Sequence, residues 1–293
     1  MSLASIIKDK AVEPLREIAA YEALWQDRSA SFKKLSELFA KNPGKLPSDL
    51  VNDLMIGDLP LLMKKLLLSL NLKPNILING TFDYPTKLKD ALEPVEILYY
   101  SGNLDLLSTR SVAIVGSRVP SENGLKRTKK LTELFVKDNF TIVSGLAKGV
   151  DTMAHKTAIS CKGKTIAVIG TPLNHVYPKE NAGLQSQIAS EHLLVSQVPF
   201  CRYDQQTFHG NRLFFPERNK TMSALTEATV IVEASETSGT LIQAQAAINQ
   251  GRKLFILDSC FQREDLRWPK KFEAQGAVRV KEYADIKRHL LID

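Results

Sequence analysis

A short glycine-containing turn is the first place where the residue types and spacing could do chemistry. Residues 111–115 (SVAIV) form an apolar run typical of a buried parallel strand, and Gly116, Ser117 and Arg118 follow it directly. A helical pattern begins a few residues later. Free N–H groups at a helix start and a guanidinium both favour phosphate or carboxylate, so the turn predicts an anion site. An ordinary α/β turn with a surface arginine explains the same residues equally well.

Similar groups follow three further apolar runs. Residues 140–145 end in Ser144 and Gly145, residues 164–170 run into a polar turn, and residues 229–234 lead to a turn containing Gly239. The carboxyl ends of parallel strands meet at one edge of a sheet, so we expect the four turns to converge there. The glycines would let the backbone approach a phosphate closely. The cations expected at this edge are Arg118, Lys148, Arg218 and Lys220.

Two other candidates for chemistry have simpler explanations. His155 lies four residues after Asp151 on an expected helix, which is the spacing of a metal pair, but no third ligand accompanies them. A helix-capping Asp151 and a packed His155 are therefore favoured, and we expect no metal site. Glu233 at a strand end could act as a general base, or it could fix the turn by accepting backbone N–H groups. No nucleophile, base and orienting group assemble, so we expect no catalytic residue.

The elements that precede these turns divide the chain into two parts. Apolar residues at helical spacing predict helices over residues 4–25, 30–42, 48–56 and 59–72. From Pro74 onward the pattern changes to short β-rich runs interrupted by proline and glycine. We therefore expect a small all-helical domain at 1–73 and a sheet domain at 74–293.

The second part alternates apolar strands with segments long enough to be helices. The expected strands are residues 112–116, 140–145, 164–170, 192–197, 229–234 and 253–258, preceded by β-rich runs at 75–80 and 96–104. Such alternation predicts an α/β fold with a largely parallel, doubly wound sheet.

Composition limits the class of protein and its partner. The chain has 293 residues, of which 44% are hydrophobic, and a formal charge of +7, which favours a polyanionic partner such as nucleic acid. Its three cysteines, Cys161, Cys201 and Cys260, form no CxxC pair, so a reducing cytoplasm is expected. We find no signal-peptide core and no apolar run long enough to span a bilayer, so no membrane association is expected.

Five motifs occur in an order that resembles the DprA/Smf family of DNA-processing proteins. They are GSRVPSENG, SGLAKGVDTMAH, KTIAVIGTPLNHVYPKEN, FPERNKTMSAL and VEASETSGTLIQAQAA followed by GR. The resemblance covers roughly residues 80 to 280. It implies an extended Rossmann-like domain preceded by a helical domain resembling a sterile alpha motif. It also implies a homodimer that binds single-stranded DNA, needs no cofactor and helps to load the recombinase RecA during natural transformation.

The same resemblance implies which residues contact the strand. Arg118 and Ser144 match family positions that touch the DNA backbone, and Ser121, Lys148, Asn219 and Lys220 line the same pocket. An aromatic residue between Val198 and Phe215 stacks on a base in relatives, and its candidates here are Phe200, Tyr203, Phe208 and Phe214, with a preference for Phe200. The expected DNA-binding set is Gly116, Ser117, Arg118, Ser121, Ser144, Gly145, Lys148, Phe200, Arg218, Asn219 and Lys220.

Several positions depart from the family pattern. Gln197 stands where a glutamate is usual, Lys220 replaces the second arginine of an RNR sequence, and ILDSCF replaces an expected Pro-Gly. Many relatives continue into a winged-helix domain, for which no sequence remains after Asp293. These differences predict a divergent paralogue, in transformation or in a mobile-element or defence setting.

The sequence also fits a second class of function, a protein that binds or hydrolyses a nucleotide. Related Rossmann families, such as the nucleoside-monophosphate phosphoribohydrolases, use similar turns with a catalytic arginine and glutamate. In this chain Arg118 and Glu233 would take those roles in a nucleotide-ligand sensor or an enzyme. SETSGT stands where those enzymes have a PGGxGT loop, which counts against the enzyme.

Overall fold

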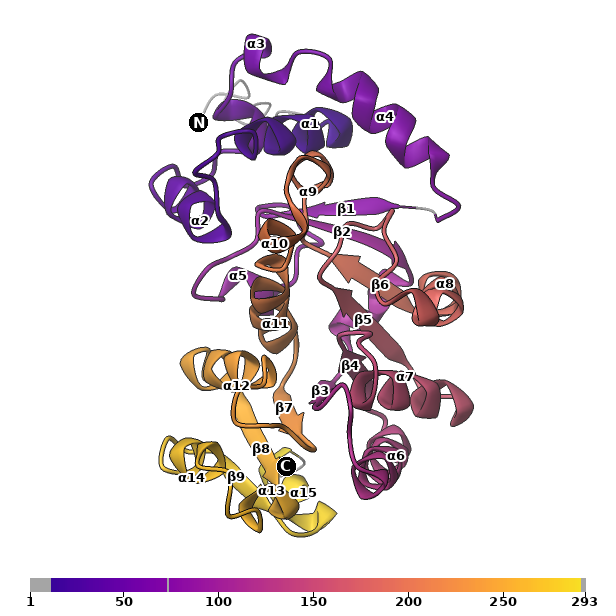
Figure 1. Ribbon diagram of the computed structural model, residues 1–293. Coiled ribbons are helices and arrows are strands. Elements are labelled where there is room, and N and C mark those ends of the chain that lie inside the picture. Colours follow the sequence, from indigo (N-terminus) through magenta and orange to yellow (C-terminus); the bar gives the residue numbers. More distant parts are fainter. Residues whose placement is uncertain (1–11, 73, 291–293) are drawn as a thin grey trace, which may run out of the picture.

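The computed structural model describes residues 12–72 and 74–290 (Figure 1). Its centre is a nine-stranded sheet. The strands are β1 (Asn75–Ile78), β2 (Ile97–Gly102), β3 (Ser111–Val115), β4 (Thr141–Ser144), β5 (Thr165–Ile169), β6 (Leu193–Ser196), β7 (Ala228–Ile231), β8 (Lys253–Leu257) and β9 (Val278–Val280). All the strands expected from the sequence are present. The three-residue β9 was not expected, because so short a run gives no periodic signal.

The strand order is β1-β2-β6-β5-β4-β3-β7-β8-β9. Strands β3 to β9 pair parallel with one another, whereas β2 pairs antiparallel with β6 and β1 pairs antiparallel with β2. The chain moves outward from β3 through β4 and β5 to β6, then returns to place β7 on the other side of β3. The fold is therefore a largely parallel, doubly wound Rossmann-like sheet with a switch point between β3 and β7.

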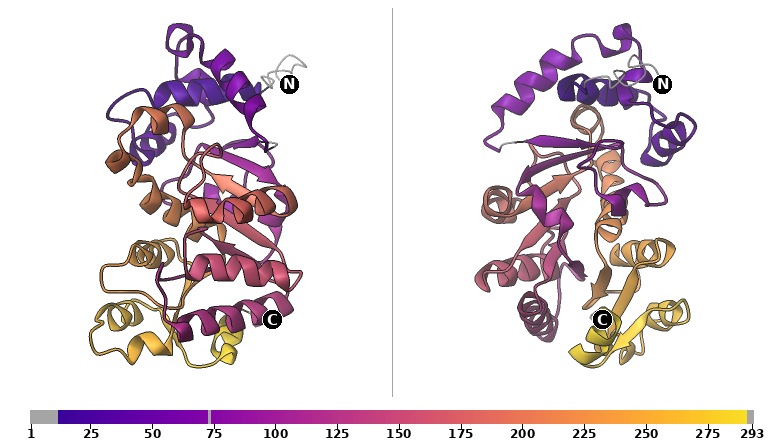
Figure 2. Two further views of the ribbon diagram at one scale, coloured as in Figure 1. Left: turned by 45° about the vertical axis from the view of Figure 1, so that its right-hand side comes forward. Right: turned by 180° about the vertical axis from the view of Figure 1, so that it is seen from behind.

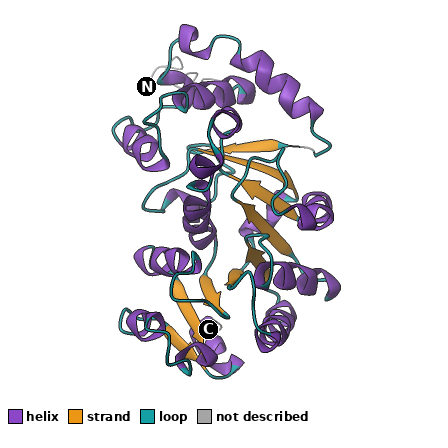
Figure 3. Ribbon diagram, in the orientation of Figure 1, coloured by secondary structure: helices purple, strands orange, loops and turns teal. Residues whose placement is uncertain are grey.

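Helices cover both faces of the sheet, as Figure 3 shows. On one face β3 and β7 pack against α6 (Glu122–Lys137), α7 (Val150–Ser160) and α15 (Tyr283–Leu290). On the other face they pack against α11 (Phe214–Leu225), α12 (Thr240–Asn249) and α14 (Trp268–Glu273). The remaining helices of this part are α5 (Thr86–Lys89), α8 (Ala182–Glu191), α9 (Phe200–Gln205), α10 (Phe208–Asn211) and α13 (Asp258–Phe261), with 3-10 turns η3 (Leu104–Ser108) and η4 (Lys179–Asn181).

The N-terminal helices lie at the β1 end of the sheet and α15 lies near the opposite end (Figure 2). They are α1 (Pro14–Leu24), α2 (Phe32–Ala40), η2 (Pro47–Asp49), α3 (Asp53–Ile56) and α4 (Leu59–Ser69). The helix expected over 48–56 is wrong, because Ser48 donates its backbone N–H and its hydroxyl to Glu17 and Asn52 starts a new helix. The first eight residues of the helix expected over 4–25 lie outside the described residues.

The sheet begins six residues after α4 ends, close to the expected boundary at residue 73, which itself is not described. The division into domains at 1–73 and 74–293 stays a prediction. Throughout residues 12–72 and 74–290, every helix is too short or too polar to cross a membrane.

Candidate functional site

A crevice of about 630 Å³ lies at the carboxyl ends of the parallel strands, at the switch point between β3 and β7. We call it the strand-end crevice. Turns after β3, β4, β5 and β7 line it together with α10 and α11. Its lining includes residues 116–119, Ala147, Asp151, Tyr177, Tyr203, Phe208, Asn211, Arg212, Phe215, Arg218, Asn219, Ser235 and 238–240. The four turns therefore meet at one edge, as the sequence predicts.

The turn after β3 brings Gly116, Ser117 and Arg118 into the crevice. Gly116 has to be glycine, because a Cβ there would lie 2.8 Å from the Glu233 carbonyl oxygen and from Val150. The turn is held by a bond from the Ser117 N–H to that carbonyl (2.7 Å). Arg118 itself is exposed, and it makes no ion pair with any described residue. Its charge is thus available to a ligand.

Two arginines approach the same aromatic ring inside the crevice. The guanidinium carbons of Arg118 and Arg218 lie 6.0 and 5.9 Å from the centre of the Phe215 ring. A third arginine, Arg212, lines the crevice, is exposed and has no carboxylate partner within the described part of the chain. The crevice therefore combines positive charge with aromatic surface, which suits an anion attached to a planar group.

Arg218 is a structural cation at the floor of the crevice. It is 5% exposed, and its Nη1 donates to the carbonyl oxygens of Gly145 (2.5 Å) and Val168 (2.6 Å). Burial lowers its pKa to about 10, and Asp151 opposes that shift, so the side chain stays charged at neutral pH. Its Nε has no partner among the described residues. Arg218 therefore adds positive potential while it ties α11 to the ends of β4 and β5.

Ser144 and Gly145 support the crevice from below and do not line it. The Ser144 hydroxyl is buried and donates to the Ile114 carbonyl at 2.7 Å, so the expected contact of this residue with DNA is wrong for this conformation. Gly145 is also buried, and a Cβ there would lie 2.0 Å from Arg218 Nη1. Glycine is needed here so that the arginine can lie against the backbone.

The start of α6 is already occupied by a carboxylate of the chain itself. Glu233 accepts the Ser121 N–H (3.1 Å) and hydroxyl (2.7 Å), and the Ser121 Oγ accepts the Gly124 N–H. Glu233 thus fixes the turn, which is one of the two roles expected for it. The N–H groups of Ser121 and Gly124 at this helix start therefore have internal partners, and the anion site and the ligand contact expected for Ser121 stay predictions.

Lys148 lies outside the crevice lining. Its Nζ is 2.5 Å from the Glu180 carboxylate, and both side chains are more than half exposed. Exposed pairs of this kind contribute little stability, and the expected contact of Lys148 with DNA stays a prediction.

The preferred aromatic, Phe200, is in the core. It is 1% exposed and packs edge-on against Tyr99, with ring centres 4.9 Å apart, so its selection for base stacking is wrong. Phe208 lines the crevice and is 68% exposed, and Tyr177 also lines it, packed edge-on against Phe215. The sequence does not separate Phe200 from Phe208, because both lie in a short segment with no periodic pattern, and Tyr177 lies outside that segment.

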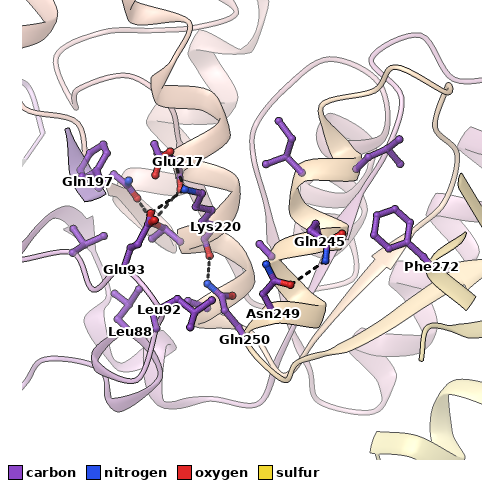
Figure 4. A pocket seen from close by; sticks show the side chains of 18 of the residues that line it. Leu88, Leu92, Glu93, Gln197, Glu217, Lys220, Gln245, Asn249, Gln250 and Phe272 are labelled. Carbon is purple, nitrogen blue, oxygen red and sulfur yellow. Dashed lines mark hydrogen bonds and ion pairs between the residues drawn. The ribbon is translucent and has the colours of Figure 1, made fainter. Parts of the chain in front are cut away.

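Asn219 and Lys220 are neighbours on α11 but belong to different cavities. The Asn219 amide donates to the Gly239 carbonyl (3.2 Å) at the crevice. Lys220 faces a second cavity of about 610 Å³ between α5, α11, α12 and α14, which we call the rear cavity (Figure 4). There it lies 2.9 Å from Glu93 and 3.0 Å from Glu217. Its expected place beside Arg118 is therefore wrong.

His155 and Asp151 do not form a metal site. His155 is buried, and its Nδ1 is 2.7 Å from the Thr165 hydroxyl. Burial lowers its pKa to about 3. Asp151 accepts the N–H groups of Gly145 and Ala147 and shapes the turn after β4. In residues 12–72 and 74–290 we find no cluster of three metal-ligating side chains.

Comparison with known sequences identifies similar proteins. The sequence profile of the DNA recombination-mediator protein A family matches residues 75–290. The chain is 37% identical over 204 residues to the DNA processing protein DprA of Bacillus subtilis, covering 69% of this chain and 67% of that protein. It is 41% identical over 174 residues to DprA of Streptococcus pneumoniae, covering 59% of each. The match to the Synechocystis protein Smf spans 46% of that relative.

Two solved structures are also similar. DprA from Streptococcus pneumoniae superposes with a TM-score of 0.73 at 28% identity, over 94% of this chain and 99% of that one. DprA from Helicobacter pylori, whose structure was described for its single-stranded DNA binding mode, gives a TM-score of 0.63 at 28% identity. That match covers 75% of this chain and 97% of the relative.

Proposed function

The chain belongs to the DNA recombination-mediator protein A family, and from that premise we propose that it binds single-stranded DNA in the strand-end crevice without cleaving it. One observation carries the proposal. Arg118 and Arg212 line the crevice without a carboxylate partner among the described residues, and exposed Phe208 lines the same crevice. The arginines hold the backbone phosphates, while Phe208 receives a base.

The arrangement favours a single strand over a duplex. Stacking on Phe208 or Tyr177 needs a base that is free of its partner, and such stacking accepts any base. The positive groups of the crevice come mainly from turns at strand ends and from α11. Among the described helices we recognise no helix-turn-helix or other element that reads a DNA groove. Sequence preference should therefore be weak, and affinity should depend strongly on salt.

The test is competition for a labelled single strand in buffer containing EDTA. Unlabelled single-stranded DNA should displace it at far lower concentration than duplex DNA, and a denaturing gel should show intact strands. Equal competition by duplex, loss of binding on metal removal, or strand cleavage would each contradict the proposal.

The nucleotide-hydrolase alternative finds less support. The Glu233 carboxylate bonds to Ser121 and does not line the crevice, so it is not placed to act on a ligand beside Arg118. A mononucleotide hydrolysis assay run beside the binding assay tests this alternative directly.

The family resemblance suggests two protein partners, a second copy of this chain and a recombinase. We propose a homodimer and an action in loading a RecA-type recombinase. The apolar residues of β8 are buried within the subunit, so the proposed assembly rests on the family resemblance alone. A monomeric mass by light scattering at tens of micromolar, or no effect on recombinase filament growth, would contradict these two parts. We also propose a cytoplasmic location, in keeping with three free cysteines.

A further inference from the structure

One wall of the strand-end crevice is built by residues 198–213, between β6 and α11. This segment, which we call the aromatic wall, contains α9 and α10 and contributes Tyr203, Phe208 and Arg212 to the crevice. Its other side faces the N-terminal helices, as Figure 1 shows where α9 approaches α1.

A buried carboxylate of α1 holds the first residues of this wall. Glu22 is 0% exposed, and its Oε1 accepts the Phe200 N–H (2.8 Å) and the Tyr99 hydroxyl (3.1 Å). Its Oε2 accepts the Cys201 N–H at 3.0 Å. Burial raises the pKa of Glu22, and the two N–H groups oppose that shift. Burying a carboxylate is costly unless its acceptors are satisfied, so these bonds define one position for the wall.

Ring contacts continue from the same helix into the crevice. Trp25, one residue beyond α1, packs against Phe214 with ring centres 6.1 Å apart. Phe214 in turn stacks on Tyr203, at 6.1 Å and an interplanar angle of 29°, and Tyr203 lines the crevice. Arg202 also donates to the Arg28 carbonyl (3.0 Å), so polar and apolar contacts hold the same segment.

We propose that Glu22 is a positioning residue for single-strand binding. Through Phe200 and Cys201 it sets the aromatic wall in the place where Tyr203 and Phe208 can receive a base. The N-terminal helices then act as part of the binding apparatus, although none of their charged side chains lines the crevice. This inference rests on the proposed function, because it assigns the wall to strand binding.

Glu17 provides a matched control on the same helix. It is also buried, at 3% exposed, and it accepts the Ser48 N–H (2.9 Å) and hydroxyl (2.7 Å). None of its hydrogen bonds reaches the aromatic wall. Glu22→Ala and Glu17→Ala both remove a buried carboxylate and leave donors without partners, so both should lower stability. Glu22 holds two backbone donors of the aromatic wall and the Tyr99 hydroxyl, whereas both donors to Glu17 belong to Ser48.

The experiment measures two quantities on the full chain. The first is amide hydrogen exchange of peptides from residues 198–213, with peptides from β3 and β4 as an internal reference. The second is affinity for a labelled oligo-dT strand over a range of salt. Glu22→Ala should speed exchange in the wall and weaken binding about ten-fold without changing the salt slope, because Arg118 and Arg212 remain. Glu17→Ala should leave the exchange rate in the wall and the affinity for the strand within two-fold of the wild-type values.

The conservative variant Glu22→Gln should have a smaller effect on binding than Glu22→Ala. Glu22→Gln keeps one acceptor oxygen but presents an NH₂ group to the Cys201 N–H, so it should weaken binding about three-fold, less than the alanine variant. If Glu22→Ala does not fold, the comparison of Glu22→Gln with Glu17→Gln decides. Equal effects of the two positions, or faster wall exchange with unchanged affinity, would overturn the inference. Absence of binding by the wild-type protein would instead overturn the proposed function, while the exchange data would still show whether Glu22 holds the wall.

Discussion

The strand-end crevice and the rear cavity lie on different sides of α11 and have nearly the same volume, about 630 and 610 Å³. Each receives a cation from that helix, Arg218 in the crevice and Lys220 in the rear cavity. The crevice also contains Arg118 and Arg212, for which the described residues supply no carboxylate. The rear cavity places Glu93 and Glu217 on either side of its lysine. The two cavities therefore differ in charge pairing.

Pairing decides which cavity attracts an anion. The cations that line the rear cavity (Lys220, Arg267, Lys271) and its carboxylates (Glu93, Glu217, Glu236) sum to no net charge. Three arginines and Asp151 give the strand-end crevice a net charge of +2, so the crevice attracts a phosphate more strongly. Burial lowers the pKa of Lys220, but the hydrogen bonds that its ammonium donates to Glu93 and Glu217 outweigh that effect and raise the pKa. A count of basic residues in a motif cannot distinguish these two situations.

The largest expected effect comes from the crevice arginine. Arg118→Ala should weaken single-strand binding about 100-fold, since hydrogen bonds to charged groups contribute about 1.5–3 kcal/mol each. The slope of log affinity against log salt should fall by about 0.7, the value for one neutralised phosphate. Fluorescence anisotropy over a salt series measures both quantities.

Arg263→Ala is the control for that variant, because the substitution removes the same charge from the protein. Arg263 is a surface arginine that is paired with Asp265. It should change affinity less than two-fold. An unchanged affinity in a folded Arg118→Ala protein would remove the turn after β3 from the binding site and would break the comparison between the two cavities.

The aromatic side of the crevice should have the next largest effect. Phe208→Ala should weaken binding about ten-fold, within the roughly 1–3 kcal/mol that stacking contributes per base. The salt slope should not change, because no cation is lost. Phe82 is an exposed phenylalanine outside the crevice, so Phe82→Ala is the matched control. Equal effects of the two variants, measured with the same oligonucleotide, would rule out Phe208 as the stacking residue.

The support beneath the crevice should respond to acid. His155 on α7 has its pKa lowered to about 3 by burial, whereas an unfolded histidine titrates near 6.5. As pH falls below 6.5 the unfolded chain gains a proton that the folded chain does not accept until about pH 3. Stability is thus present above pH 6.5 and lost on acidification, by about 1.4 kcal/mol between pH 7.5 and 5.5.

Urea unfolding at these two pH values measures the loss. In His155→Gln the decrease should be smaller than in the wild type by about that amount, because glutamine does not titrate. The same decrease in both proteins would show that His155 is not the group responsible.

The smallest effect is expected at the rear cavity. Lys220→Ala should change single-strand affinity less than two-fold, because the lysine charge is already neutralised and faces away from the crevice. The measurement is the same titration used for Arg118→Ala. A ten-fold loss of affinity would show that the strand contacts the rear cavity, and the two cavities would then not differ in DNA binding.

Much of the fold follows from local pattern. The six apolar runs from residue 112 to 258 are all strands, and the turns that follow four of them converge. Buried parallel strands can be predicted in this way because each is a short continuous apolar run. The exception is the helix expected over 48–56, where hydrogen bonds from Ser48 to Glu17 on another element decide the structure.

The site is predicted less well, for two physical reasons. Adjacent residues on an α-helix point about 100° apart, so a motif that names Arg218, Asn219 and Lys220 together does not say which cavity each one faces. Burial of Phe200 depends on Glu22 and Tyr99, which lie far away in the sequence. Phe208 is one of four aromatic candidates that the sequence does not rank correctly, and Arg212 is missed altogether. Both are exposed and gain their place only from the packing of the aromatic wall.

The contact between Glu22 and Phe200 spans 178 positions of the chain. During synthesis the ribosome makes the N-terminal helices first, and residue 200 follows only after about 10–35 seconds at common elongation rates. Until then the Glu22 carboxylate lacks its backbone donors from α9 and has to stay hydrated. The helices can form early, but their docking belongs to the high contact order part of folding. Completion of the crevice is therefore a late event that waits for most of the chain.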